Sequence, residues 1–247
     1  MSKKAEIVYL HQQQSRQAGS LTDKIVVGSD ITPAEAVDLA NDHGPIQVVS
    51  GGLDENRVVR IRENLQGFLS DPAESLIDGD HDSRVRFERV FDGKTTKTEL
   101  LTDFKDFLKS NKFRRVRDDL VLIADELFTN FSKSATDNIK EMNFVVESDG
   151  ESLVIFCRDF YGTLVPQKMI ENMKRCYDQG VRNAIKKDES GGAGIGSYLI
   201  YTLGVGMAIT VEPGKSSLVS IWMPQNMHHE DRIELNKSLI IIEVKET

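Results

Sequence analysis

The spacing of apolar residues in the first third of the chain predicts a small α/β unit over residues 21–75. An apolar run at Ile25–Val27 predicts a strand, and Thr32-Pro33 predicts the start of a helix that ends at Gly44-Pro45. A further apolar run at Ile46–Val49 predicts the next strand. A second helix is expected beyond it, with apolar positions at helical spacing: Val58, Ile61, Leu65, Phe68 and Leu69.

The rest of the chain shows the same alternation of strand and helix signals. Residues 71–83, rich in Asp, Ser, Gly, Pro and His, indicate a linker, and residues 84–225 form the second expected unit. Its strands are expected at 85–90, 143–147, 153–158, 207–211 and 218–222, and its helices at 100–108, 116–140, 166–182 and 195–202. Asp149-Gly150 is typical of a hairpin turn. Residues 1–20 are expected to be a flexible arm, and residues 226–247 a C-terminal tail with one apolar run at Leu239–Val244.

Composition restricts the class of protein. Of the 247 residues, 39% are hydrophobic and 28% charged, which is typical of a globular protein. A net charge of −8 argues against a non-specific binder of nucleic acid or anionic membranes, because both polyanions would be repelled. There is no apolar run of about 20 residues and no signal-peptide core, and Cys157 and Cys176 form neither a disulfide framework nor a zinc pattern. The sequence therefore predicts a cytoplasmic protein that is not held in a membrane.

The expected long helix carries the first chemical signal. Glu126, Asn130 and Lys133 are four and three residues apart and so project from one face, beside the apolar stripe. A carboxylate, an amide and an ammonium in this order suit a base, a metal ligand and a phosphate contact. The alternative interpretation is a polar helix surface with weak ion pairing. The apolar stripe consists of Leu120, Ile123, Ala124, Leu127 and Phe131.

Two further signals follow in the sequence. Glycines at 192, 194 and 196 precede an expected helix, and backbone amides at such a position bind anions. The spacing differs from that of a Rossmann or P-loop motif, and a tight turn is the alternative. Asp159 ends an expected strand and is followed by Gly162, a pattern that suits either recognition of an amine or simple turn chemistry.

The order of these three signals resembles the GHKL superfamily of Bergerat-fold ATP-binding domains, to which sensor histidine kinases, gyrase-type ATPases and anti-sigma-factor kinases belong. The similarity covers roughly residues 84 to 225 and is greatest to the anti-sigma-factor serine/threonine kinases, which also carry a long helix similar to DDLVLIADELFTNFSKSA. It implies that Asn130 ligates Mg²⁺, that Glu126 is the catalytic carboxylate, and that Lys133 faces the phosphates of ATP.

The resemblance also assigns the later residues. Asp159 corresponds to the aspartate that binds the adenine amino group, and Ser217 lies near the residue that closes the adenine side. Gly192, Gly194 and Gly196 would surround the phosphates, with residues 174–190 as the ATP lid. The family pattern Asp-x-Gly-x-Gly is altered, because Tyr161 and Thr163 stand at its glycine positions. A shifted loop that uses Gly162 would have to compensate.

The fold expected is therefore α/β (α+β): a Bergerat sandwich whose mixed sheet is covered by helices on one face, with a smaller N-terminal α/β unit. The function expected is that of an ATP-binding regulatory protein of the anti-sigma-factor type, with a regulatory protein as partner and a homodimer among its expected states. Phosphorylation of a serine or threonine on that partner would make it a kinase. The alternatives are a sensor-histidine-kinase-like ATP-binding protein and a non-catalytic, nucleotide-gated binding module.

Two histidine-containing segments and one arginine cluster are expected to have no role in the chemistry of the site. His81 to Arg84 resemble a phosphoacceptor box only faintly, and we expect linker there. His228-His229 are expected in a solvated tail, because no fourth metal ligand is suitably spaced. Arg114, Arg115 and Arg117 are expected at a solvated helix entry, with the acidic face of a partner as the alternative.

Overall fold

The computed structural model describes residues 7–9, 24–50, 53, 55–78, 83–92, 96–110, 113–134, 141–185 and 195–244. The strands are β1 (Ile7–Tyr9), β2 (Ile25–Val27), β3 (Gln47–Val49), β4 (Val85–Phe91), β5 (Met142–Ser148), β6 (Ser152–Asp159), β7 (Gly206–Glu212), β8 (Ser216–Pro224) and β9 (Ser238–Glu243). The helices are α1 (Pro33–His43), α2 (Glu55–Glu63), α3 (Leu65–Ser70), α4 (Ala73–Leu76), α5 (Lys97–Ser110), α6 (Arg117–Ser134), α7 (Pro166–Gln179), α8 (Val181–Ala184), α9 (Gly196–Leu203) and α10 (His229–Ile233). No helix within these ranges is long and apolar enough to cross a bilayer.

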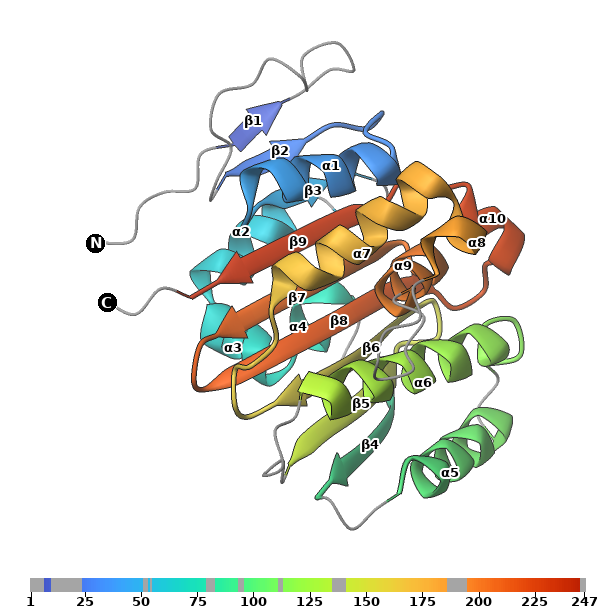
Figure 1. Cartoon of the computed structure of the whole chain (residues 1–247). Helices are drawn as coiled ribbons and strands as arrows, with labels where there is room; N and C mark the ends of the chain where they lie inside the picture. Colours follow the sequence, from blue (N-terminus) through green and yellow to red (C-terminus); the bar gives the residue numbers. More distant parts are fainter. Residues whose placement is uncertain are drawn as a thin grey trace.

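The strands form one mixed sheet in the order β1-β2-β3-β9-β7-β8-β6-β5-β4 (Figure 1). The pairs β1/β2, β2/β3 and β7/β9 are parallel, and the other pairs are antiparallel. The expected α/β class is thus confirmed. The sheet runs without a break from the first three strands to the last, because β9 lies between β3 and β7.

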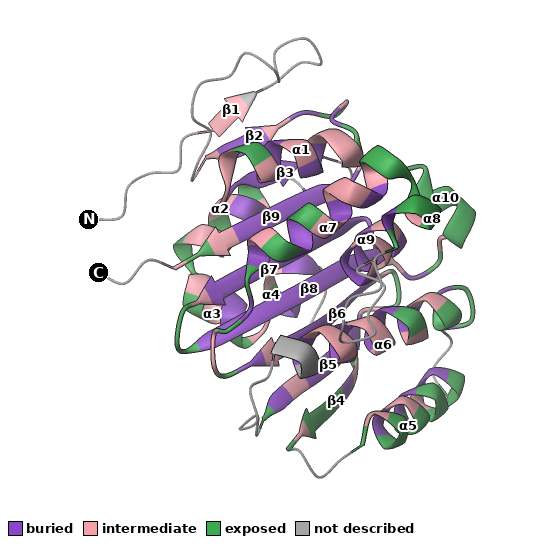
Figure 2. Cartoon of the chain, viewed as in Figure 1, coloured by how far each residue is buried: buried purple, intermediate pink, exposed green. Residues whose placement is uncertain are grey.

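Helices cover both faces of the sheet, so the expectation of a single covered face is wrong. Successive residues of a strand point to opposite faces. In β6, Leu153 and Ile155 belong to the core under α1, α5, α6, α7 and α9, whereas Val154 and Phe156 belong to a second core with α2, α3 and α4. In Figure 2 the central strands are buried along most of their length. The second core was missed because the helices that cover it come from the first third of the chain.

Local signals explain most element boundaries. Thr32 caps α1 with a complete capping box, in which its side chain and that of Glu35 each accept a backbone hydrogen bond. The second helix expected in this part of the chain is divided at Asn64, whose side-chain oxygen accepts from the backbone N–H of Gly67 at 3.2 Å. An asparagine side chain that binds its own backbone in this way starts a new helix, so α2 and α3 are separate.

Two segments expected to lie outside the folded units are part of the packed structure. Within the expected linker 71–83, α4 forms and buries Ala73, Leu76 and Ile77 in the second core. Within the expected tail, α10 contains the fully buried Arg232, and β9 occupies the interior of the sheet. The apolar run at Leu239–Val244 forms most of β9, whereas the polar residues around α4 and α10 gave no sign that these helices pack against the sheet.

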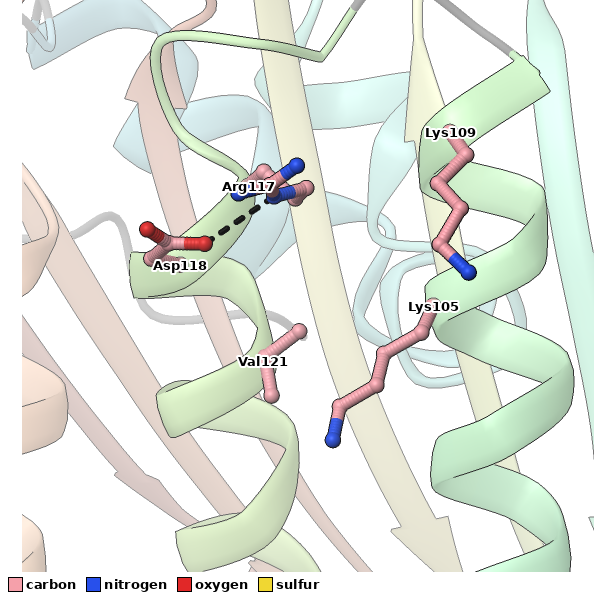
Figure 3. A pocket seen from close by; sticks show the side chains of 5 residues that line it. All are labelled: Lys105, Lys109, Arg117, Asp118 and Val121. Carbon is pink, nitrogen blue, oxygen red and sulfur yellow. Dashed lines mark hydrogen bonds and ion pairs between the residues drawn. The ribbon is translucent and has the colours of Figure 1, made fainter.

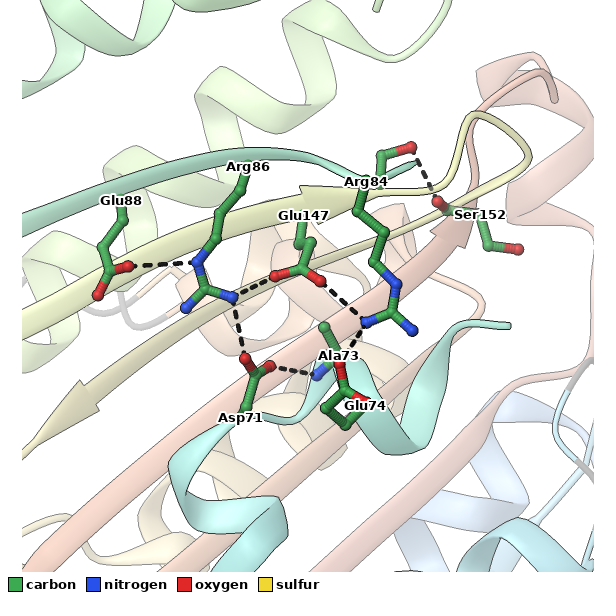
Figure 4. A network of polar contacts seen from close by, with 9 residues as sticks. Asp71, Ala73, Glu74, Arg84, Arg86, Glu88, Glu147 and Ser152 are labelled. Atoms are coloured by element: carbon green, nitrogen blue, oxygen red, sulfur yellow. Dashed lines mark hydrogen bonds and ion pairs between the residues drawn. The ribbon is translucent and has the colours of Figure 1, made fainter. Parts of the chain in front are cut away.

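An ion-pair network fixes the first of these segments to the sheet (Figure 4). Its centre is Glu147 of β5, whose side chain is 1% exposed. One carboxylate oxygen accepts from Arg84 at 2.9 Å, and the other accepts from Arg86. Arg84 also pairs with Glu74 at 2.9 Å, and Arg86 with Asp71 at 2.9 Å. The network therefore connects the α3–α4 segment to the outer strands β4 and β5.

We expect the substitution Glu147→Gln to lower the free energy of unfolding by about 3 kcal/mol, because it leaves two partly buried guanidinium groups without their shared carboxylate. Urea denaturation followed by circular dichroism measures this change. Glu88→Gln is the matched control, since Glu88 also pairs with Arg86 but is 44% exposed, and we expect a loss below about 1 kcal/mol. Equal losses in the two variants would contradict a central role for Glu147.

Candidate functional site

The site is built first on α6, whose apolar stripe fixes the direction of its polar face. Leu120, Ile123, Ala124, Leu127 and Phe131 are all buried, as expected. Glu126 and Asn130, one turn apart and each half-buried, face the first turn of α9. A methyl group placed on Gly196 would lie 2.1 Å from Oε2 of Glu126 and 3.7 Å from Nδ2 of Asn130. The structure thus brings together three of the expected site residues, and a side chain larger than glycine at 196 would displace the Glu126 carboxylate.

The amide of Asn130 carries one of nine buried side-chain nitrogen or oxygen atoms that lack a hydrogen-bond partner among the described residues. Its Nδ2 atom is buried and has no hydrogen-bond partner within the described part of the chain. A buried donor without an acceptor costs about 1–3 kcal/mol, so such a group in a native structure points to a missing partner. The other end of the amide is an oxygen, the type of atom that Mg²⁺ prefers as a ligand.

The first turn of α9 supplies the positive end of the site. Ile195 stands at the N-cap and makes no side-chain capping bond, so the first backbone N–H groups of α9 are not capped by that side chain. Such groups, together with the helix dipole, favour anions. Gly192 and Gly194 lie outside the described residues, as does the side chain of Lys133. The expected lid 174–190 begins inside α7, where Lys174 pairs with Asp38 of α1 at 2.5 Å.

Asp159 organises a second corner, at the end of β6. Its Oδ1 accepts hydrogen bonds from the backbone N–H groups of Tyr161 and Gly162, each at 2.9 Å, and of Ser217 at 3.0 Å. Asp159 and Ser217 are also paired in register across β6 and β8. The Ser217 hydroxyl in turn accepts from the backbone N–H of Leu164 at 3.2 Å. Asp159, Gly162 and Ser217 therefore meet in one corner, and these bonds use only one of the two carboxylate oxygens.

Gly162 is required in this corner for packing. Its φ is +62°, and a methyl group on it would lie 2.1 Å from the backbone oxygen of Glu212 and 2.8 Å from the backbone nitrogen of Gly214. The turn between β7 and β8 thus leaves room only for glycine. Tyr161 and Thr163 stand on either side of it. In Figure 1, α6 and β6 both end on the left, so the Asp159 corner and the last turns of α6 lie toward the same end of the strands.

Two residues that sequence reasoning missed support α9 from its other end. Arg232 is fully buried, and its Nε donates to the backbone oxygen of Leu203 at 3.1 Å while a terminal nitrogen pairs with Asp119 of α6. Lys237 is 1% exposed, and its Nζ donates to the backbone oxygens of Gly204 at 2.6 Å and Arg232 at 2.8 Å. Cations at a helix C-terminus are stabilising. Nothing in the local sequence marks either residue, because the partners that tie them to α6 and α9 are about 30 to 113 residues away.

The remaining candidate residues from the sequence are a cysteine and two histidines. Cys157 is buried in the core as expected, and burial raises the pKa of its thiol well above the usual range. His229 lies on α10 and contacts Asp119 at 3.2 Å, but its side chain is 48% exposed, so it is solvated as expected. The described residues contain no cluster of three metal-ligating side chains. His81 lies outside the described residues.

Comparisons with known proteins add no family to this geometry. No protein-family model matches the chain, and no curated protein matches it. The resemblance to the GHKL superfamily therefore stays a hypothesis, which the contacts of Glu126, Asn130 and Gly196 make testable.

The burial of Lys237 leads to a pH-dependent prediction. Burial, with a smaller contribution from nearby Arg232, lowers the pKa of Lys237 to about 8. Between pH 8 and the unfolded value of about 10.4, the unfolded chain binds a proton that the folded chain has lost, so stability from this group rises with pH. Relative to Lys237→Met, the wild type should gain about 1–2 kcal/mol between about pH 7.5 and pH 9.5.

Urea denaturation of both proteins across this pH range measures the difference. Contributions from Cys157 and the buried tyrosines, which also titrate at alkaline pH, are common to both proteins and cancel. Parallel pH profiles would show that Lys237 keeps an ordinary pKa.

Proposed function

We propose that this chain is an ATP-binding regulatory protein of the anti-sigma-factor type, with Mg²⁺ and the phosphates of ATP bound between α6 and the first turn of α9. The observation that carries the proposal is the contact of Glu126 and Asn130 with Gly196, at which a buried amide nitrogen lacks a partner. The proposal extends the resemblance of residues 84–225 to the GHKL superfamily.

The side chains in this place fit the two ligands chemically. Asn130 and Glu126 offer oxygen atoms, and Mg²⁺ binds through one or two protein oxygens together with waters and phosphate oxygens. The Nδ2 atom of Asn130 is a donor for a phosphate oxygen, which would satisfy it. The first backbone N–H groups of α9 would receive the phosphates, as helix N-termini commonly do.

The Asp159 corner would hold the adenine. A carboxylate whose position is fixed by three backbone N–H groups is rigid, and its second oxygen is able to accept a hydrogen bond from an exocyclic amine. Ser217 is positioned in the same corner by its bond to Leu164. This assignment places the base and the phosphates at opposite ends of one site, on the side of the sheet that α6 and α9 cover.

The transfer reaction would depend on Glu126. As the hydroxyl oxygen of a partner serine or threonine bonds to the γ-phosphorus, the bond to the bridging oxygen of ADP breaks, and Glu126 accepts the hydroxyl proton. The N–H groups of α9 would hold the charge that develops on the phosphoryl oxygens. Bound Mg²⁺ supplies further neutralisation of that charge.

A second function is favoured by one specific observation, namely the packing of Gly162 against the turn between β7 and β8. In the family pattern, two glycines leave space beside the adenine, and this chain has Tyr161 and Thr163 at those positions. Gly162 does not restore that space, because it packs against the backbone of Glu212. Side chains at these positions reduce the room for an adenine. A nucleotide-gated binding module without transfer activity is therefore the alternative, with the same Mg²⁺ and phosphate contacts.

We expect Asn130→Ala to abolish Mg²⁺-dependent binding of ATP while the fold stays intact, because it removes both the proposed metal ligand and the unsatisfied donor. Isothermal titration calorimetry with and without Mg²⁺ measures the binding, and circular dichroism checks the fold. Asn56→Ala is the control, since Asn56 is an exposed helical asparagine on α2, on the opposite face of the sheet. Unchanged affinity in Asn130→Ala would contradict the proposal.

Glu126→Gln distinguishes the enzyme from the binding module. It keeps the shape of the side chain but removes its basicity, so we expect ATP binding to persist and turnover to fall by about 10²–10⁴-fold. Transfer from radiolabelled ATP to proteins captured with this chain measures turnover, and Glu171→Gln on the exposed surface of α7 is the control. If the wild type shows neither transfer nor hydrolysis, the chain is the binding module; if Glu126→Gln keeps full turnover, Glu126 is not the base.

A further inference from the structure

A basic groove lies between α5 and the first turns of α6 (Figure 3). Its volume is about 470 Å³, and it is lined by Lys105, Lys109, Arg117, Asp118 and Val121. Lys105 and Lys109 are four residues apart on α5, and Arg117 and Val121 are four residues apart on α6, so each pair shares one face of its helix. Figure 3 shows the Lys105 side chain directed from α5 toward the helix that carries Val121, and the Lys109 side chain extending along α5 above it.

The cations of the groove are available to a ligand. Lys109 pairs with Asp106 at 2.8 Å and Arg117 with Asp118 at 3.0 Å, and in both pairs each side chain is about half exposed or more. Exposed pairs of this kind contribute little and exchange readily for other partners. Lys105 makes no ion pair with any described residue, and Arg114, exposed just before α6, makes none either. Within a chain of net charge −8, this is a local concentration of positive charge.

The groove also has an apolar element. Val121 is half-buried and packs against the main core, so one of its faces remains accessible beside the lysines. The aliphatic parts of Lys105 and Lys109 extend this apolar surface while their ammonium groups reach water. A ligand that fits must therefore carry an apolar group between negative charges.

The groove is separate from the proposed nucleotide site. Arg117 begins α6, and Asn130 lies 13 residues further along the same helix, about 20 Å away at 1.5 Å per residue. The residues that line the groove make none of the contacts described for Glu126, Asn130 or Asp159. A ligand in the groove and a nucleotide between α6 and α9 would not compete for space.

We propose that the groove between α5 and α6 binds an acidic segment of a partner protein, with an apolar side chain on Val121 and Asp or Glu carboxylates at Lys105, Lys109 and Arg117. Charge complementarity selects this ligand. A nucleic acid is less suitable, because its continuous phosphate charge extends beyond the groove and is repelled by the negative charge of the whole chain. A short peptide segment covers only the basic surface.

The test uses two synthetic peptides of 12 residues, labelled with a fluorophore. The first carries one isoleucine flanked by Asp and Glu residues, and the second replaces every Asp and Glu by Asn or Gln. Fluorescence anisotropy with the full chain should show binding of the acidic peptide, weakening as salt is raised from about 50 to 500 mM, and binding of the amide peptide at least about tenfold weaker.

The double variant Lys105→Glu/Arg117→Glu should weaken binding of the acidic peptide by at least about tenfold. Its matched control is Arg60→Glu/Lys168→Glu, which changes the net charge equally but alters exposed residues on α2 and α7, and it should retain nearly wild-type affinity. Equal loss in both double variants, or equal affinity for the two peptides, would overturn the proposal. Tighter binding of a single-stranded oligonucleotide than of the acidic peptide would overturn it as well.

Discussion

The constraint on which the rest of this structure depends is the burial of both faces of the central strands. In β6, alternate residues such as Ile155 and Phe156 enter two different cores, and β8 contributes to both cores in the same way through Ile221 and Trp222. Each such side chain stabilises the fold by about 1.5–3 kcal/mol when it is removed from water. Neither face of the sheet is therefore stable without a covering layer, and the helices between residues 55 and 76 form the second layer.

Buried charges hold this double-layered fold together at points where distant segments meet. Glu147 joins Arg86 across 61 residues, and Asp119 joins Arg232 across 113 residues. A charge removed from water is costly unless it is paired and hydrogen-bonded, so both networks need their distant segments in place. The first positions the α3–α4 segment over the outer strands. The second holds α10 and the start of β9 against α6 and α9.

Short-range signals in the sequence were sufficient for most elements, since caps, turns and helical periodicity act over a few residues. The capping box of Thr32, the Asp149-Gly150 turn and the apolar stripe of α6 all predicted what forms. The placement of β9 beside β7, and the burial of Arg232 and Lys237, depend on contacts between distant residues and leave no periodic pattern. The same limit applies to the site: the sequence showed Glu126 and Asn130 on one face, but only the packing of α6 on α9 brings Gly196 to them.

The arrangement around α9 also constrains what is able to bind there. Its negative end is held by Arg232 and Lys237, and its positive end faces the Glu126 carboxylate, so both ends of the helix dipole already have a complementary charge. A free phosphate at the first turn would approach that carboxylate, and two like charges about 4 Å apart repel by about 4 kcal/mol at an effective dielectric constant of about 20. Under the proposed function, a divalent cation would offset this repulsion. A phosphate that arrives together with Mg²⁺ would then bind better at Gly196 than the same phosphate alone.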